Sequence, residues 1–139
     1  MSPHFPSMDE VIHIHDDQIE RYGGIPGIRD LDLLSSAISM PEAGFGDRYF
    51  HSDIFEMTAT YLYHLVQNHP FLDGNKRVGA MAAFTFLQLN GHHLKAKTTA
   101  FETIIRKVAQ GKEAKAVVAA FFRKHSQPQY IKRRILHSD

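Results

Sequence analysis

The chain has 139 residues, of which 43% are hydrophobic and 22% charged, the balance of one soluble globular domain rather than a disordered segment. The 16 Lys and Arg against 15 Asp and Glu give a net charge of +1, so composition offers no general case for a nucleic-acid or membrane partner. The absence of cysteine excludes a disulfide framework, a thiolate nucleophile and a Cys-ligated zinc site.

The first residues lack the basic-then-apolar order of a signal peptide, and no apolar run approaches the roughly 18 residues of a membrane span. We therefore expect a cytoplasmic protein. One domain is expected over residues 1–125, followed by a basic tail over 126–139 that carries Lys132, Arg133 and Arg134. Such a tail is more typical of a solvated chain end than of an RNA contact.

The first predicted helix begins at a capping box of Ser7 and Glu10 and ends near Tyr22, where two glycines follow. A loop rich in Gly and Pro occupies residues 23–27. Asp30 can then cap a short helix that ends before Pro41, because the residue before a proline disfavours helical geometry.

Residues 41–52 lack a helical pattern and predict a loop or a small hairpin. Ser52 or Asp53 can cap the next helix, whose apolar positions keep helical spacing as far as Asn68. A second long helix is expected from Asn75 or Lys76 to Asn90; it is apolar nearly all round and should therefore be buried.

Thr99 and Glu102 predict another capping box, and Gly111 separates that helix from a last one over Lys112 to Lys124. Strand-like alternation is almost absent from the chain. The predicted fold class is therefore all-α: a single bundle of about six helices with a short loop or hairpin between the second and third.

The loop between the two long helices carries the densest chemistry, residues 69–77, with the sequence HPFLDGNKR. Gly74 allows a tight turn and the close approach of a ligand. The backbone amides of Gly74, Asn75 and Lys76 would lie at a helix N-terminus, which favours an anion. Lys76 and Arg77 add two cations, and Arg can bind phosphate oxygens through two parallel hydrogen bonds.

The same loop offers groups for proton transfer and metal binding. Asp73 supplies an oxygen ligand for Mg²⁺, and His69 can accept a proton near neutral pH. Each residue alone has an ordinary explanation: His69 as a helix-end cap, Asp73 and Gly74 as a turn pair, Phe71 as a core anchor. Together they favour a phosphate-binding site, because a plain helix connection has little need of so many polar groups.

Residues 69–77 resemble the signature of the Fic/Doc superfamily, which is close to H-P-F-x-[DE]-G-N-x-R. Further similarity to the Doc branch lies in residues 15–27, 53–62 and 86–91. The resemblance covers about residues 8 to 125 and implies the helical Fic/Doc fold.

The resemblance also implies roles for individual positions. They are His69 as general base, Asp73 as Mg²⁺ ligand, Gly74, Asn75 and the loop amides as nucleotide-phosphate ligands, Lys76 and Arg77 as phosphate-binding catalytic cations, and Phe71 as the anchor of the loop. The segment 41–52 would be the flap that holds a target peptide by strand addition.

Two positions indicate the subclass. Fic proteins that transfer AMP typically have Gly where this chain has Lys76 and a second Arg where it has Ala80. Lys76 instead matches the Doc form, which implies transfer of the γ-phosphate of ATP, with Mg²⁺, to a threonine of a translation protein such as elongation factor Tu. Two alternatives remain open: transfer of AMP or UMP, and a catalytically idle module that captures peptides.

The resemblance further implies regulation by a partner, because Doc toxins are silenced by a small antitoxin that packs beside the active site. Residues 52–56 and 98–102 match the first five positions of the inhibitory [ST]-x-x-x-E-[GN] helix that other Fic proteins carry, but Met57 and Thr103 break the sixth. We therefore expect a toxin–antitoxin module with a separate antitoxin chain.

Overall fold

The computed structural model describes residues 2–129. Six α-helices account for most of this part of the chain: α1 (Met8–Tyr22), α2 (Leu31–Ser39), α3 (Ile54–Asn68), α4 (Asn75–Leu89), α5 (Thr98–Ala109) and α6 (Lys115–His125). A single 3₁₀ turn, Met40–Glu42, follows α2. The predicted all-α fold is confirmed.

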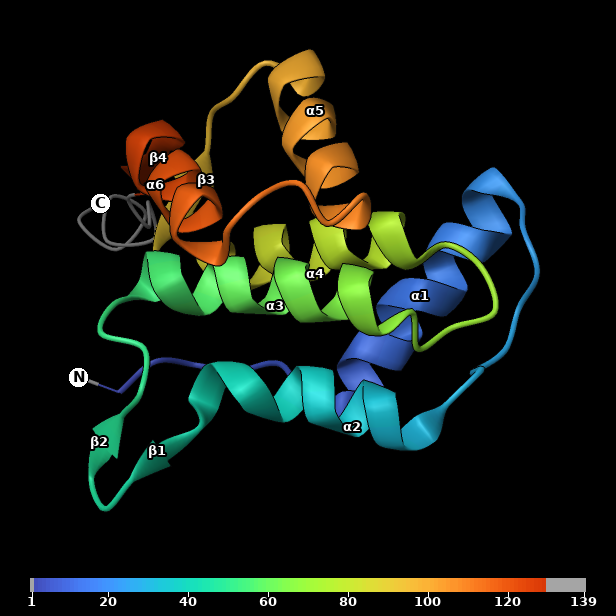
Figure 1. The fold of residues 1–139 in the computed structure, drawn as a ribbon, viewed down its shortest axis with the longest axis horizontal. Coiled ribbons are helices and arrows are strands. Elements are labelled where there is room, and N and C mark those ends of the chain that lie inside the picture. Colours follow the sequence, from blue (N-terminus) through green and yellow to red (C-terminus); the bar gives the residue numbers. More distant parts are fainter. Residues whose placement is uncertain (1, 130–139) are drawn as a thin grey trace, which may run out of the picture.

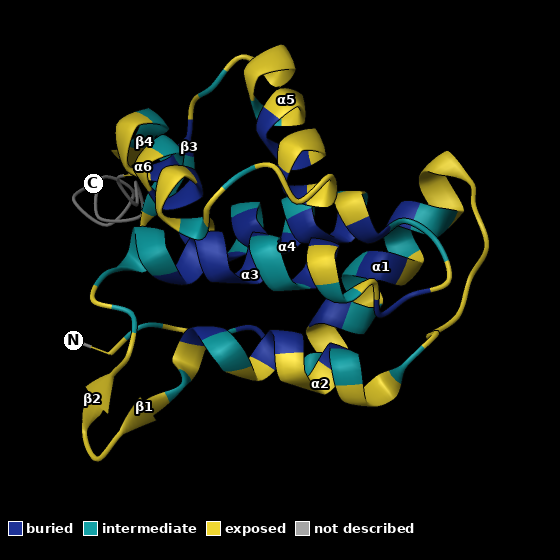
Figure 2. Ribbon diagram, viewed as in Figure 1, coloured by how far each residue is buried: buried dark blue, intermediate teal, exposed yellow. Residues whose placement is uncertain are grey.

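Helices α3 and α4 form the centre of the molecule (Figure 1). On one side they pack against α1 and α2, and on the other against α5 and α6. Figure 2 shows that buried residues follow both central helices along their length. The core therefore divides into two main clusters that share α3 and α4, and the connection between these two helices emerges at one end of the bundle.

Local capping signals set most helix starts as predicted. Ser7 and Glu10 form the reciprocal capping box, Asp30 accepts a hydrogen bond from the Leu33 amide, and Asp53 rather than Ser52 caps α3. The predicted box at Thr99 is wrong, because α5 already begins at Thr98 without a side-chain cap.

Two small antiparallel sheets complete the fold. Strand β1 (Gly44–Phe45) pairs with β2 (Arg48–Tyr49), and β3 (His92–Leu94) pairs with β4 (Ser126–Pro128). The second sheet was not predicted, since three-residue strands are too short to display alternation. Strand β4 lies in the segment assigned to the basic tail, whereas Lys132, Arg133 and Arg134 lie outside the described residues.

The β1–β2 hairpin confirms the loop or hairpin predicted for residues 41–52. The hairpin precedes the start of α3, and the 69–77 loop follows its end (Figure 1). Because α3 has 15 residues, it separates the two by about 22 Å. Within residues 2–129, no helix is both long and apolar enough to cross a bilayer.

Two phenylalanines test this division into core and periphery. Phe86 of α4 is fully buried against Tyr61, whereas Phe45 in the hairpin is 83% exposed. We expect Phe86→Ala to lower the free energy of unfolding by about 3–5 kcal/mol and Phe45→Ala to change it by less than about 0.5 kcal/mol. Urea unfolding measures both, and similar losses for the two variants would contradict this placement of the core.

Candidate functional site

The loop between α3 and α4 begins with an unusual backbone conformation. His69, the C-cap of α3, has φ 53° and ψ 51°, and it is the one non-glycine residue of the described chain with positive φ. Arg29 satisfies the carbonyls released there: its Nε donates to the His69 carbonyl at 2.6 Å and its Nη2 to the Asn68 carbonyl at 2.9 Å. A cation at a helix C-terminus also interacts favourably with the helix dipole.

The connection between α1 and α2, residues 23–30, lies along this loop. The amides of Arg29 and Asp30 both donate to the Pro70 carbonyl, and the Leu72 amide donates to the Gly27 carbonyl at 3.0 Å. Ile28 and Phe71 form an antiparallel bridge. The run of Gly and Pro in residues 23–27 predicts a loop, but no signal in the sequence identifies the 69–77 loop as its partner.

Asn75 joins the two halves of the loop from inside. Its side chain is only 4% exposed. The Oδ1 atom accepts a hydrogen bond from the Phe71 amide at 2.9 Å, and Nδ2 donates to the Phe71 carbonyl at 3.0 Å and lies 2.7 Å from Nδ1 of His69. The two Phe71 contacts fix which end of the carboxamide is the donor. Because its donors are used within the loop, any phosphate contact by Asn75 falls to its backbone N–H.

Phe71 occupies the position expected of an anchor. Its side chain is buried in the cluster between α1, α2 and α4, and its ring stacks on the imidazole of His15 with centroids 3.8 Å apart. Nε2 of His15 lies 2.7 Å from the Asp73 carbonyl. The floor of the loop is therefore formed by helix α1.

The carboxylate of Asp73 is held by two backbone amides, that of Ile25 at 3.1 Å and that of Gly74 at 2.8 Å. These hydrogen bonds, first from Ile25 and then from Gly74, lower the pKa of Asp73 below its ordinary value, so the group is ionised at neutral pH. Over the described part of the chain, no three His, Asp or Glu side chains gather as metal ligands. A single carboxylate still fits Mg²⁺, which commonly takes one or two carboxylates together with substrate phosphates.

Helix α4 begins at this loop with its N-terminus open. Its N-cap is Gly74, with φ 76° and no side chain to cap, and its first turn carries no acidic residue. The first N–H groups of a helix have no acceptor within it. Those of Asn75, Lys76 and Arg77 thus form a ready site for an anion.

The open helix end faces a cavity of about 450 Å³, which is lined by every residue predicted to bind phosphate or metal or to transfer a proton. They are His69, Asp73, Gly74, Asn75, Lys76 and Arg77. Arg77 also donates from Nη2 to the Gly23 carbonyl at 2.9 Å and from Nη1 to the Gln18 carbonyl at 3.3 Å, at the end of α1. The arrangement offers a proton acceptor, a carboxylate, two cations and free amides around one volume.

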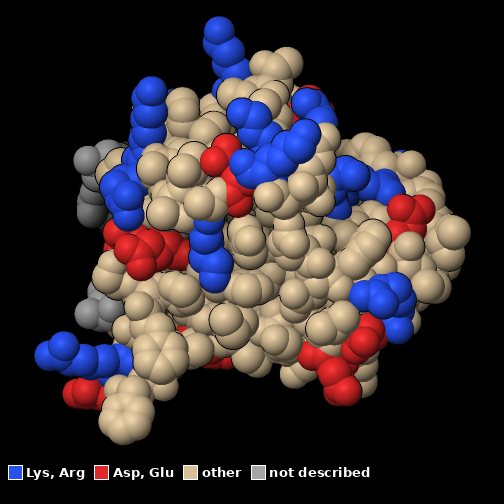
Figure 3. Space-filling model, viewed as in Figure 1, with Lys and Arg blue, Asp and Glu red and all other residues tan. Residues whose placement is uncertain are grey.

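A larger groove of about 660 Å³ adjoins this cavity and shares Lys76 and Arg77 with it. Its floor is apolar and comes from α4, β3 and α5: Ala80, Phe84, Leu94, Phe101 and Ile105. Arg106 and Glu102 of α5 add charges to its lining. In the view of Figure 3, basic side chains lie mostly on the side of the molecule formed by α5 and α6, interspersed with acidic ones.

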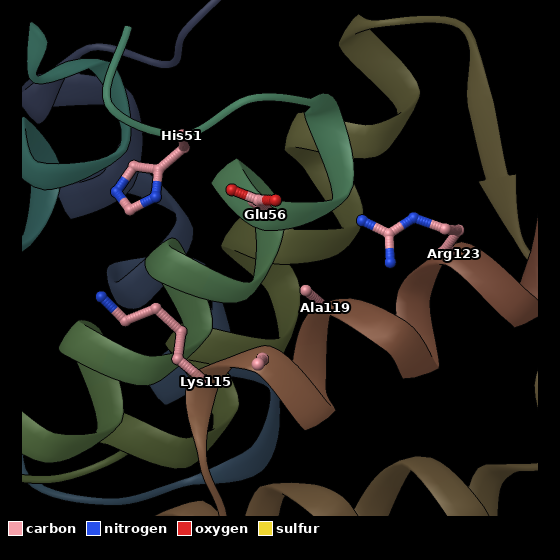
Figure 4. Close-up of a pocket in the computed structure, with 6 residues that line it drawn as sticks. His51, Glu56, Lys115, Ala119 and Arg123 are labelled. Atoms are coloured by element: carbon pink, nitrogen blue, oxygen red, sulfur yellow. The ribbon is translucent and has the colours of Figure 1, made fainter.

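A third cavity, of about 340 Å³, lies between α3, α6 and the segment before α3 (Figure 4). Nζ of Lys115 donates to Nε2 of His64 at 2.8 Å, Arg123 pairs with Asp53 at 2.8 Å, and the Glu56 carboxylate accepts from Ser52. Burial, reinforced by the charge of Lys115, lowers the pKa of His64 to about 4. Since these groups satisfy one another, we interpret the cluster as structural.

Comparison with known proteins points in one direction. The model of the Fic/DOC family matches residues 5–87. The chain is 39% identical over 85 residues to "Protein kinase doc" of Escherichia phage P1, a match that spans 61% of this chain and 67% of that protein. It is 37% identical over 75 residues to "Toxin Doc" of Mycolicibacterium smegmatis, spanning 54% of this chain and 58% of that protein.

The lowered pKa of His64 predicts a pH dependence of stability. The folded state disfavours the charged ring, so its contribution is complete above the unfolded pKa of 6.5 and is lost as pH falls toward 4. His64→Gln keeps an acceptor for Lys115 but cannot titrate, and it should lose less stability between pH 7 and pH 4.5 than the wild type. Urea unfolding at both pH values measures this, with exposed His13→Gln as the control that should follow the wild type. Parallel losses in all three proteins would contradict the prediction.

Gly24 should be intolerant of a side chain because of Asp73. A Cβ there would lie 2.8 Å from Asp73 Oδ2 and 3.0 Å from Arg77 Nη2, whereas a Cβ at Gly23 would meet nothing within 4 Å. Both glycines have positive φ, so backbone strain is common to the two substitutions. We expect Gly24→Ala to cost about 1 kcal/mol or more of unfolding free energy beyond the cost of Gly23→Ala. Equal costs in thermal or urea unfolding would show that the connection does not press on Asp73.

Proposed function

This chain belongs to the Fic/DOC family, and we propose that it is a toxin kinase that transfers the γ-phosphate of ATP to a protein hydroxyl. The acceptor we propose is a threonine of a translation protein such as elongation factor Tu, whose modification would arrest translation. The observation that carries the proposal is the uncapped N-terminus of α4, which shares one cavity with His69, Asp73, Lys76 and Arg77. The name of the phage P1 relative, a protein kinase, supports the same reaction.

In the proposed reaction, the acceptor hydroxyl oxygen forms a bond to the γ-phosphorus while the bond from that phosphorus to the bridging oxygen breaks. ADP leaves, and the hydroxyl proton passes to His69. The amides of α4 with Lys76 and Arg77 stabilise the negative charge on the phosphate oxygens. Asp73 would hold Mg²⁺, which would supply positive charge to neutralise part of the charge on the nucleotide phosphates.

The hydrogen bond from Asn75 restricts how His69 can accept that proton. Nδ1 of His69 is the acceptor of this bond, so the neutral ring carries its proton on Nε2. Base chemistry therefore requires the Asn75 contact to open when the substrates bind. Nδ1 can then take the hydroxyl proton, or hold the ring proton while Nε2 accepts.

Lys76 and Ala80 favour γ-phosphate transfer over nucleotidyl transfer. Lys76 projects from the first turn of α4, where the Gly of AMP-transferring relatives would leave space for a phosphate. Ala80 lies one turn further, in the apolar groove, where those relatives have a second Arg. A lysine at the first position and no arginine at the second redistribute the positive charge toward the open end of the helix.

We place target binding on the α1–α2 connection rather than on the β1–β2 hairpin. The connection lies against the 69–77 loop, and apolar side chains beside it are exposed: Ile25 is 60% exposed, and Leu31 and Leu72 are also exposed. An extended target segment along this backbone would bring its hydroxyl to His69. The hairpin lies a full helix length away.

The groove beside the cavity is our proposed antitoxin site. Its apolar floor suits the nonpolar face of a helix, and Lys76, Arg77 and Arg106 suit acidic residues at the edge of that face. A helix seated there would cover Lys76 and Arg77 and so compete with ATP. The relative named as a toxin in M. smegmatis supports the assignment to a toxin–antitoxin module.

Incubation of the purified chain with α- or γ-labelled ATP, Mg²⁺ and elongation factor Tu tests the reaction. We expect label to reach the protein from the γ position only, and His69→Ala to reduce the rate by roughly 10²-fold or more. His13→Ala, which changes an exposed histidine of α1, should retain the wild-type rate.

Transfer of label from the α position would contradict the kinase proposal and show that the chain is a nucleotidyltransferase. If neither label is transferred and His69→Ala binds the partner as the wild type does, the chain is a binding module.

A further inference from the structure

His15 is a buried titratable residue to which the proposed reaction gives no task. It lies in α1, far in sequence from the 69–77 loop, and is only 1% exposed. Among residues 2–129, its ring makes one hydrogen bond, from Nε2 to the backbone carbonyl of Asp73 at 2.7 Å. We propose that His15 is a positioning residue that holds the Asp73 carboxylate in the orientation needed for the metal–nucleotide complex, an inference that rests on the proposed function.

The chemistry of the contact fixes the proton on the His15 ring. A carbonyl oxygen only accepts hydrogen bonds, so Nε2 must carry the proton and donate it. The other ring nitrogen, Nδ1, lies 3.9 Å from the Asp16 carboxylate, which is beyond hydrogen-bond distance. His15 therefore acts on the loop through one directed bond.

That bond fixes the peptide plane between Asp73 and Gly74. The C=O and N–H of a trans peptide point in opposite directions, so a carbonyl directed at α1 turns the Gly74 N–H away from it. This N–H donates to Oδ1 of Asp73 at 2.8 Å, and the Ile25 amide holds Oδ2. Release of the carbonyl would allow the plane to rotate and would remove one of the two amides that orient the carboxylate.

Stacking prevents the imidazole from turning out of this arrangement. Its ring lies 3.8 Å from that of Phe71 at an interplanar angle of 7°, and a Cβ placed on Gly74 would be 3.6 Å from Nε2. The hydrogen bond and the stacking together give the imidazole one orientation against the loop. Groups that orient a metal ligand in this way typically change metal affinity by about 10–100-fold when removed.

Two substitutions separate the hydrogen bond from the packing. His15→Phe keeps an aromatic ring to stack on Phe71 but removes the donor, and His15→Gln keeps an N–H donor but removes the ring. We expect His15→Phe to weaken Mn²⁺ binding in the presence of a non-hydrolysable ATP analogue by about 10-fold or more, measured by the paramagnetic signal of free Mn²⁺. His15→Gln should recover most of this affinity even where its melting temperature is lower. Unchanged Mn²⁺ affinity in a folded His15→Phe protein would overturn the proposal, as would equal losses of affinity in both variants.

A measurement without nucleotide makes failure of this inference distinguishable from failure of the proposed function. ¹⁵N NMR of the wild-type protein should show neutral His15 protonated at Nε2, with a slowly exchanging ring proton that is coupled across the hydrogen bond to Asp73. A ring protonated at Nδ1 would refute the positioning bond whatever reaction the chain performs. If the NMR result and the Mn²⁺ result both hold but no phosphate is transferred, the positioning role stands and the kinase assignment falls.

Discussion

The buried carboxamide of Asn75 is the interaction on which the geometry of the site depends. It forms hydrogen bonds with both the amide and the carbonyl of Phe71, a residue that is held in the core. It also contacts the ring of His69, which lines the cavity. One side chain thus transfers the rigidity of the core to an exposed imidazole. Because the carboxamide is buried, loss of any of these bonds would leave a polar group without water to replace its partner, a cost of about 1–3 kcal/mol. That cost holds the loop in one conformation before any ligand arrives.

The two helix ends that meet at this loop differ in whether a side chain satisfies their backbone groups, and this difference creates the site. At the end of α3, Arg29 satisfies the carbonyls of Asn68 and His69 and offsets the strain of the left-handed backbone at His69. At the start of α4, no side chain caps the amides. A closed carbonyl end and an open amide end leave a net preference for anions at the junction. Arg77 strengthens this preference. Its hydrogen bonds to carbonyls at the end of α1 also connect α1 to the junction of α3 and α4.

What the sequence could predict follows from how local each signal is. The two residues of a capping box, such as Ser7 and Glu10, lie three positions apart, so the start of α1 could be predicted from the sequence. The chemistry of residues 69–77 is contiguous, and this is why the cavity contains the polar residues expected of it. The bonds that shape the loop are long-range: 40 residues separate Arg29 from His69 and 48 separate Ile25 from Asp73. No pattern along the chain distinguishes these long-range partners.

The separation of the two ends of α3 also organises the charge of the molecule. Near the start of the helix, Lys115, Arg123, Asp53 and Glu56 largely neutralise one another, and burial keeps His64 uncharged. At the far end, Lys76 and Arg77 lie beside free amides, with Asp73 as the carboxylate of the cavity lining. The charge is therefore unevenly distributed, although the net charge of the whole chain is only +1. Attraction for phosphate is concentrated at the N-terminus of α4, where free backbone amides can also bind it. Under the proposed function Asp73 would not cancel this attraction, because a divalent cation bound to it would add positive charge near the phosphates of the nucleotide.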